Sequence, residues 1–210
     1  MCKPSENLAE ADHRNSIWRA PEYSSEQRRI LLAIAHEAID LRIAGKPFPD
    51  WRTISPDSSL LWPALEQPRG VFTTLYLLGK LRGCVGYAKP MLPLSRAVAE
   101  TACAAAFEDS RFWPVAAEET SELRISLSIL SLFFPIKATQ VQVGRHGLSI
   151  SDGVRRGLLL PQVPVEHDWD RETFLEQTCR KAGLPLDAWE KSATIEAFEA
   201  EVFGDDCVSR

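Results

Sequence analysis

The segment Leu81-Arg82-Gly83-Cys84-Val85-Gly86 places a thiol beside a cation and between two glycines. A nearby positive charge and free backbone N–H groups favour the thiolate, which is the nucleophilic form of cysteine. Glycines in a strand remove side chains, so that a ligand or another backbone can approach closely. The pattern makes Cys84 a candidate nucleophile, and the candidate substrate-binding residues beside it are Arg82, Gly83 and Gly86. The alternative is a small cysteine packed in a glycine-kinked hairpin.

Two further residues could complete a catalytic site with this thiol. His146 lies in the short turn Arg145-His146-Gly147, and Glu166 follows a proline-rich bend. Histidine titrates near neutral pH, so His146 could act as the base for Cys84, with Glu166 orienting the imidazole. The alternative for His146 is a side chain that hydrogen-bonds its own turn. No metal site is predicted, because His146, Glu166 and His167 lack the spacing of known ligand motifs.

Gln162 and Arg111 are candidates for ligand contacts. Gln162 lies in Pro161-Gln162-Val163, which otherwise shapes the backbone, and its amide could hydrogen-bond a ligand. Arg111 lies in Asp109-Ser110-Arg111-Phe112 and could bind an anion or join two subdomains through an ion pair, the commoner use. No cofactor is predicted. The chain also lacks the cysteine triplet that would hold an iron–sulfur cluster, so it is not itself predicted to be a radical SAM enzyme.

Helices and strands alternate along the chain. Helices are predicted for residues 24–44, 93–107 and 171–182, and the first has Ser24 and Gln27 at capping-box spacing. Two more cysteines, Cys103 and Cys179, lie on apolar helical faces and are predicted to be core residues. The predicted strands are residues 71–78, 81–87, 123–133, 141–144, 148–151, 154–160 and 194–203, with a turn at Gly79-Lys80. This order indicates an α+β fold with mostly antiparallel sheets.

The remaining segments are predicted to be a structured loop and two tails. Residues 47–68 have no sustained period and form a long loop, with Trp51 and Trp62 as anchors. Residues 1–22 lack a patterned apolar face and are expected to be a mobile tail that contains Trp18 and Cys2. The folded domain is predicted to span residues 23–204, followed by a short tail, residues 205–210, that contains Cys207.

Composition excludes several classes of protein. The 210 residues are 45% hydrophobic and contain no apolar run near the roughly 20 residues of a membrane span. Five scattered cysteines without a CxxC pair argue against a disulfide framework and a zinc ribbon. A net charge of −5 without long basic runs argues against nucleic-acid binding. The first twenty residues contain no secretory h-region, so a cytoplasmic location is expected.

Ordered blocks of sequence resemble the AMMECR family, in particular the bacterial and archaeal branch called AmmeMemoRadiSam system protein A. The similarity covers about residues 25–203, although Phe134-Pro135 stands where family members commonly carry Glu-Pro. Besides the Arg-Gly-Cys segment, the matching blocks include Gly70-Val71-Phe72-Thr73-Thr74, Asp109-Ser110-Arg111-Phe112, Ser126-Leu127-Ser128-Ile129-Leu130, Val143-Gly144-Arg145-His146-Gly147-Leu148, Leu160-Pro161-Gln162-Val163 and Cys179-Arg180-Lys181-Ala182-Gly183. The resemblance implies two unequal α/β subdomains with a cleft near the Arg-Gly-Cys loop. It also implies association with a Memo-like protein and a radical SAM protein, and it implies no known reaction.

Three functions are compatible with this sequence. The leading hypothesis is a member of a multi-component modification system that binds a small substrate or partner peptide in a cleft around residues 82–86, His146 and Glu166. The first alternative is a thiol-dependent enzyme that transfers an acyl or alkyl group through Cys84, with His146 as base. The second alternative is a noncatalytic scaffold that docks a Memo-like or radical SAM partner through the loop from Trp51 to Trp62.

Overall fold

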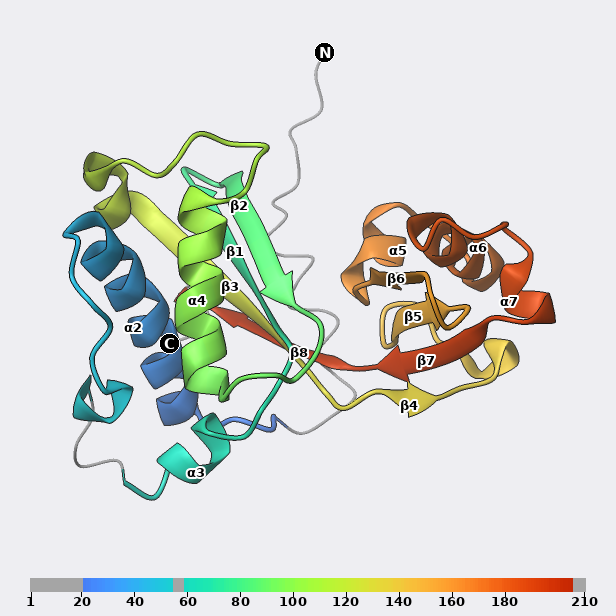
Figure 1. The fold of residues 1–210 in the computed structure, drawn as a ribbon, viewed down its shortest axis with the longest axis horizontal. Helices are drawn as coiled ribbons and strands as arrows, with labels where there is room; N and C mark the ends of the chain where they lie inside the picture. The colour runs from blue at the N-terminus through green and yellow to red at the C-terminus, as the bar shows by residue number, and fades with distance from the viewer. Residues whose placement is uncertain (1–20, 55–58, 206–210) are drawn as a thin grey trace, which may run out of the picture. The chain divides into compact units, whose positions relative to one another are not determined.

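The computed structural model describes residues 21–54 and 59–205 of the chain. The chain divides into two compact units, each with helices and a four-stranded sheet (Figure 1). The larger unit consists of Pro21–Leu130 and the segment that starts at Glu201, and the smaller unit consists of Ser131–Ala200. The strand pairs in both sheets for which a register is defined are antiparallel. The predicted α+β fold is therefore confirmed.

The sheet of the larger unit has the strand order β2-β1-β3-β8. Its strands are β1 (Val71–Leu77), β2 (Lys80–Tyr87), β3 (Leu123–Leu130) and β8 (Ala200–Gly204). Thr74 of β1 lies opposite Cys84 of β2 on one side and opposite Ser126 of β3 on the other. Because β2 has a neighbouring strand on one side only, Cys84 lies on an edge strand.

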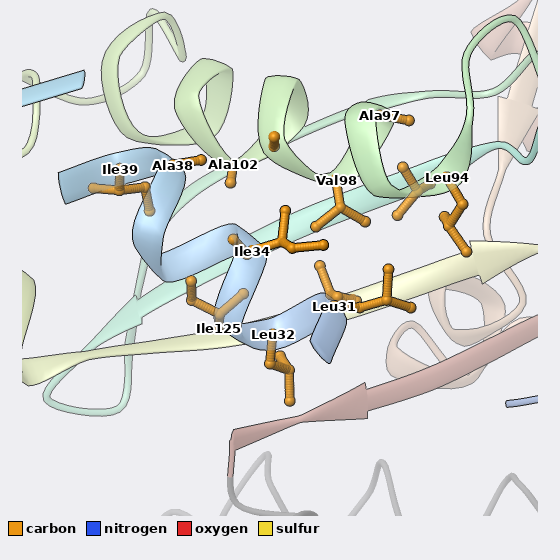
Figure 2. Close-up of a cluster of buried hydrophobic side chains, with 14 of the residues drawn as sticks. Leu31, Leu32, Ile34, Ala38, Ile39, Leu94, Ala97, Val98, Ala102 and Ile125 are labelled. Atoms are coloured by element: carbon orange, nitrogen blue, oxygen red, sulfur yellow. The ribbon is translucent and has the colours of Figure 1, made fainter. Parts of the chain in front are cut away.

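Two long helices, α2 (Ser25–Ile43) and α4 (Leu94–Phe107), pack together on this sheet (Figures 1 and 2). Figure 2 shows Ile34 of α2 between Val98 of α4 and Ile125 of β3. All three side chains are buried. The capping box predicted at Ser24 is present, since Ser24 Oγ accepts a hydrogen bond from Gln27 N and the Gln27 side chain accepts one from Ser24 N.

Shorter elements complete the larger unit. The loop predicted for residues 47–68 contains the helical turns η1 (Trp51–Ile54) and α3 (Trp62–Leu65). Trp51 and Trp62 are only 7% and 5% exposed, which confirms that they anchor this loop. A further 3-10 turn, η3 (Ala117–Glu122), precedes β3.

The smaller unit contains a second sheet with the strand order β4-β7-β5-β6. Its strands are β4 (Phe134–Pro135), β5 (Gly147–Ser151), β6 (Arg156–Leu159) and β7 (Thr194–Phe198). Its helices are η4 (Ala138–Gln140), α5 (Gln162–Glu166), α6 (Arg171–Lys181) and α7 (Ala188–Lys191). Helix α6 packs on β5 and β6 and buries Phe174 against Leu148 and Ile150. Asp170 caps α6, accepting a hydrogen bond from Thr173 N at 2.8 Å.

Four local predictions were wrong. The hairpin turns at Leu78-Gly79, one residue earlier than predicted, and both residues have positive φ. Residues 141–144 form no strand, because the chain folds into a turn closed by a hydrogen bond from His146 N to Gln142 O. The strand predicted for 123–133 ends at Leu130. The strand predicted for 194–203 is two strands in different sheets, interrupted at Glu199, whose backbone N–H and C=O both bond to Ser131.

Most of both predicted tails lies outside the described residues, including Trp18, Cys2 and Cys207. At the start of the described chain, Glu22 N donates to the Glu201 carboxylate at 2.6 Å. At its end, the Asp205 carboxylate accepts a hydrogen bond from Ile125 N at 2.7 Å. Across the described ranges, no helix has both the length and the apolar character needed to cross a bilayer.

Candidate functional site

Cys84 lies on the sheet face of the larger unit that is turned away from the helices. Val71 and Leu75 of β1 point toward the helices and are fully buried, so the alternate residue Thr74 and its partner Cys84 point to the other face. The Cys84 thiol is partly exposed and lies 3.2 Å from Thr74 Oγ1, within hydrogen-bonding distance. Cys84 is therefore a partly exposed residue whose thiol has a hydroxyl neighbour.

The space beside both glycines is filled by the chain itself. A Cβ atom on Gly83 would lie 2.1 Å from the carbonyl oxygen of Ala105, so Gly83 allows the backbone of α4 to approach the strand. A Cβ on Gly86 would lie 2.3 Å from the ring of Phe72. Of the two uses predicted for these glycines, the close approach of another backbone is observed at Gly83. Any ligand contact at these positions would have to use their backbone atoms.

Arg82 does not supply a free positive charge to Cys84, contrary to the prediction. Its guanidinium forms an ion pair with Glu119, with Nε at 2.9 Å and Nη2 at 2.8 Å from the carboxylate oxygens. It also donates to the carbonyl oxygens of Trp113 and Pro114, at 2.8 and 3.2 Å. Arg82 thus fixes the loop after α4, although Trp113 in that loop keeps 88% of its surface exposed.

The backbone N–H of Cys84 is not free either. It donates to Asp109 Oδ2 at 2.9 Å, and this carboxylate is only 6% exposed. Arg111 binds the same carboxylate with Nε at 2.9 Å and Nη2 at 2.7 Å. The Arg111 hydrogen bonds and the Cys84 N–H together hold the pKa of Asp109 well below its usual range, against the opposing effect of burial.

Sequence reasoning missed Asp109, although it singled out the block that contains it. The available signal was the Asp-x-Arg spacing directly after a predicted helix. Asp109 and Arg111 belong to the same unit, so this ion pair does not join the two units. The guanidinium of Arg111, 56% exposed, is the cation that lies beside Cys84, with Nη2 3.5 Å from the Cys84 carbonyl oxygen.

His146 is engaged by its own turn, which is the alternative considered for it above. Its side chain is buried, and Nδ1 accepts a hydrogen bond from Gln142 N at 3.1 Å. The ring of Phe134 packs edge-on against the imidazole. Burial, and secondarily the charge of Arg145, lower the pKa of His146, while Glu199 opposes this shift. His146 is therefore neutral at pH 7 with its proton on Nε2, so its free ring nitrogen is a donor.

Gln162 and Glu166 lie on α5, the former half-buried and the latter exposed. His167 stacks on Trp169, with ring centroids 4.7 Å apart. Among the residues that the structure describes, no group of three potential ligands could hold a metal ion. Gln162, Glu166 and His146 belong to the smaller unit and Cys84 to the larger one, so a surface shared by all of them stays a prediction.

Comparisons with known proteins identify the family. The AMMECR1 family model matches residues 32–203, which is most of the chain. The chain belongs to the AMMECR1 family. A Methanococcus aeolicus protein is 44% identical over 151 residues, 67% of this chain and 76% of the relative. A Methanothermobacter thermautotrophicus protein is 38% identical over 191 residues, 87% of this chain and 96% of the relative.

A solved structure supports the same fold for this AMMECR1-family chain. The crystal structure of an uncharacterised protein from Pyrococcus horikoshii superposes with a TM-score of 0.76 and is 35% identical in sequence. The match covers 88% of this chain and 94% of the solved one. The predicted family and fold class are therefore both confirmed.

The lowered pKa of His146 predicts a pH-dependent stability for the smaller unit. Burial disfavours the protonated imidazole in the folded chain. When the pH is low enough for His146 to be protonated in the unfolded chain, this protonation favours the unfolded state. The free energy of unfolding should fall as pH drops below about 6.5, the ordinary pKa of histidine. His146→Asn, whose Oδ1 can replace Nδ1 as acceptor, should lose this dependence. Urea unfolding of both proteins at several pH values tests this, and an equal pH dependence in both would contradict it.

Proposed function

We propose that this protein binds a small substrate or partner peptide at the surface around Cys84, as part of a modification system that includes a Memo-like protein and a radical SAM protein. The observation that carries the proposal is the partly exposed Cys84 thiol on a sheet face turned away from both helices, within 3.2 Å of the Thr74 hydroxyl. The partner proteins are proposed from the resemblance to the AmmeMemoRadiSam branch.

The groups around Cys84 favour a ligand with oxygen acceptors. The Thr74 hydroxyl and the thiol can each donate a hydrogen bond, and the half-exposed guanidinium of Arg111 carries further donors. A carbonyl, carboxylate or peptide group is complementary to this set. In this proposal, Arg82 contributes by fixing the neighbouring loop.

A thiol-dependent reaction is the second candidate function. The accessibility of Cys84 favours it, because a nucleophile must reach its substrate. His146 is the proposed base and Glu166 its orienting partner. Since Nδ1 of His146 already accepts a hydrogen bond, catalysis by this base would have to use Nε2. The proton on Nε2 would first have to leave, which makes binding the better supported of the two functions.

A noncatalytic scaffold is the third candidate, and the structure changes where its contact surface would lie. Trp51 and Trp62 are buried against the larger unit's core, so these two side chains are not available to a partner. Within the same loop, Leu60 is 93% exposed and would be the apolar contact. Docking through this loop should therefore be sensitive to Leu60→Ser and insensitive to changes around Cys84.

Protection of Cys84 from alkylation tests the proposed function. Native protein is treated with limiting iodoacetamide, alone, with the purified Memo-like protein of the same organism, or with a deproteinised small-molecule extract of its cells. At least one addition should slow labelling of Cys84 without slowing labelling of urea-unfolded protein. If neither addition changes the rate, the surface around Cys84 is not the binding site.

The variants Cys84→Ser and Cys84→Ala separate binding from catalysis in the same system. A binding surface should lose only modest affinity in either variant, whereas a nucleophile should lose turnover by several orders of magnitude. The product of the complete three-protein system, compared between wild type and variants by mass spectrometry, provides the measurement. Full turnover by Cys84→Ser would exclude the thiol-dependent reaction.

A further inference from the structure

Asp109 and Arg111 occupy the outer edge of β2 at the position of Cys84. In this edge strand, the Cys84 N–H points away from β1 and into the Asp109 carboxylate, while Arg111 Nη2 lies 3.5 Å from the Cys84 carbonyl oxygen. Asp109 thus accepts the Cys84 N–H, and Arg111 lies at the Cys84 C=O. On an edge strand, these are the backbone groups with which a further strand would otherwise pair.

The position of Asp109 follows from the packing of α4 on β2. The helix lies close to the strand at Gly83, the residue directly before Cys84, where an added Cβ would meet the Ala105 carbonyl oxygen at 2.1 Å. Asp109 lies one helical turn beyond Ala105 and two residues after the helix ends at Phe107. A close contact at Gly83 therefore brings the carboxylate to the amide of the next residue.

We propose that Asp109 is a positioning residue for Cys84: its buried carboxylate fixes the Cys84 backbone at the strand edge and holds the Arg111 guanidinium beside it. This inference rests on the proposed function, in which Cys84 is the centre of the site. Asp109 acts through Cys84 and Arg111 and contacts no ligand itself. Asp109 also weakens the electrostatic effect of Arg111 on the Cys84 thiol, because its negative charge neutralises part of the charge on Arg111.

Other charged groups of the larger unit lie on or near this strand, including the exposed Lys80 at its start. Arg82, two residues before Cys84 in β2, is bound to Glu119 of η3. Arg124 of β3 lies opposite Tyr76 of β1 and hydrogen-bonds the Leu123 carbonyl oxygen. Thr74, the β1 partner of Cys84, is uncharged. Asp109 and Arg111 contact the Cys84 backbone directly.

Two substitutions should shift the reactivity of Cys84 in opposite directions. Asp109→Asn keeps an oxygen that can accept the Cys84 N–H but removes the negative charge, so Arg111 stabilises the thiolate more strongly. Arg111→Gln removes the cation and leaves the carboxylate, which disfavours the thiolate. The pH midpoint of Cys84 alkylation should fall by about half a unit in the first variant and rise by about half a unit in the second.

Site-resolved iodoacetamide labelling of the full chain across a pH series tests this inference. Below the midpoint, a half-unit shift corresponds to a rate roughly threefold higher in Asp109→Asn and roughly threefold lower in Arg111→Gln. Arg111→Lys keeps the charge and should stay near the wild-type midpoint. A residue that only stabilised the fold would loosen the strand in every variant and raise labelling at all pH values, without midpoint shifts of opposite sign.

The outcomes separate this inference from the proposed function. If native wild-type Cys84 does not label at any pH, the proposed function fails, and the inference fails with it. If wild-type Cys84 labels but both variants shift alike or not at all, only the inference is overturned. Where Asp109→Asn does not fold, Asp109→Glu keeps the charge with a longer side chain. Deuterium exchange at the Cys84 amide should then be faster than in wild type, and unchanged exchange would overturn the inference.

Discussion

With limiting iodoacetamide at pH 8, native protein should label at Cys84 well before Cys103, and labelling of Cys103 should be about a hundred times slower than in the urea-unfolded chain. Cys103 is 8% exposed, its Sγ donates to the Ala38 carbonyl oxygen, and burial raises its pKa to about 11. A pKa two units above the model value of 9.0 lowers the thiolate fraction about a hundredfold. Cys179 is fully buried and its pKa is also raised by burial, so it should also react slowly. Cys84 is partly exposed.

Tryptic mass spectrometry after timed quenching measures the three rates separately. The control is the same reaction in urea, where the three cysteines should label at similar rates because burial is lost. Native Cys84 that stayed unlabelled until the protein unfolded would contradict the prediction. Cys84 would then be a packing residue, and both binding and catalysis at this position would be excluded.

Gly83→Ala should destabilise the larger unit by about 3 kcal/mol, because the added methyl group has no space. Its Cβ would lie 2.1 Å from a backbone oxygen of α4, and a helix backbone cannot rotate aside as a flexible side chain can. Helix α4 would have to move away from β2, which would also withdraw Asp109 from the Cys84 amide. Urea unfolding gives the loss of stability, and faster deuterium exchange at Cys84 would report the lost contact.

Gly79→Ala in the same hairpin is the matched control. Gly79 has φ +76°, but nothing lies within 4 Å of its would-be Cβ. This variant should cost about 1 kcal/mol through backbone strain alone. Equal losses in the two variants would show that the close approach of α4 at Gly83 does not limit stability, and would remove the packing argument that places Asp109.

Local signals in the sequence were enough for the elements whose ends are set by neighbouring residues. The helix after Ser24 begins where the capping box predicts, because its first N–H groups are satisfied by Ser24 and Gln27. Trp51 and Trp62 anchor a loop without periodicity, since a large apolar ring in such a segment must be buried somewhere. Ordered sequence blocks indicated the family, and the α+β class followed from the alternation of hairpins and helices.

Hydrophobic periodicity failed where specific hydrogen bonds, near or distant in sequence, decide the structure. Residues 194–203 have the pattern of one strand, but Glu199 pairs with Ser131 and divides the segment between two sheets. Residues 141–144 are apolar enough for a strand, yet the imidazole of His146 accepts the Gln142 N–H and closes a turn instead. The hydrophobic periodicity of a segment identifies neither the partner nor the geometry of such a contact.

The sequence by itself determined that Cys84 lies in a glycine-flanked strand after a tight turn, within an α+β protein of this family. Only the tertiary structure decided which charged side chains lie close to Cys84. Arg82 is only two residues away in sequence, but it is ion-paired with Glu119. Asp109 and Arg111 are more than twenty residues away and contact the Cys84 backbone, because α4 packs closely against Gly83. Electrostatic interactions depend on distance through space, and that distance is fixed by packing between elements.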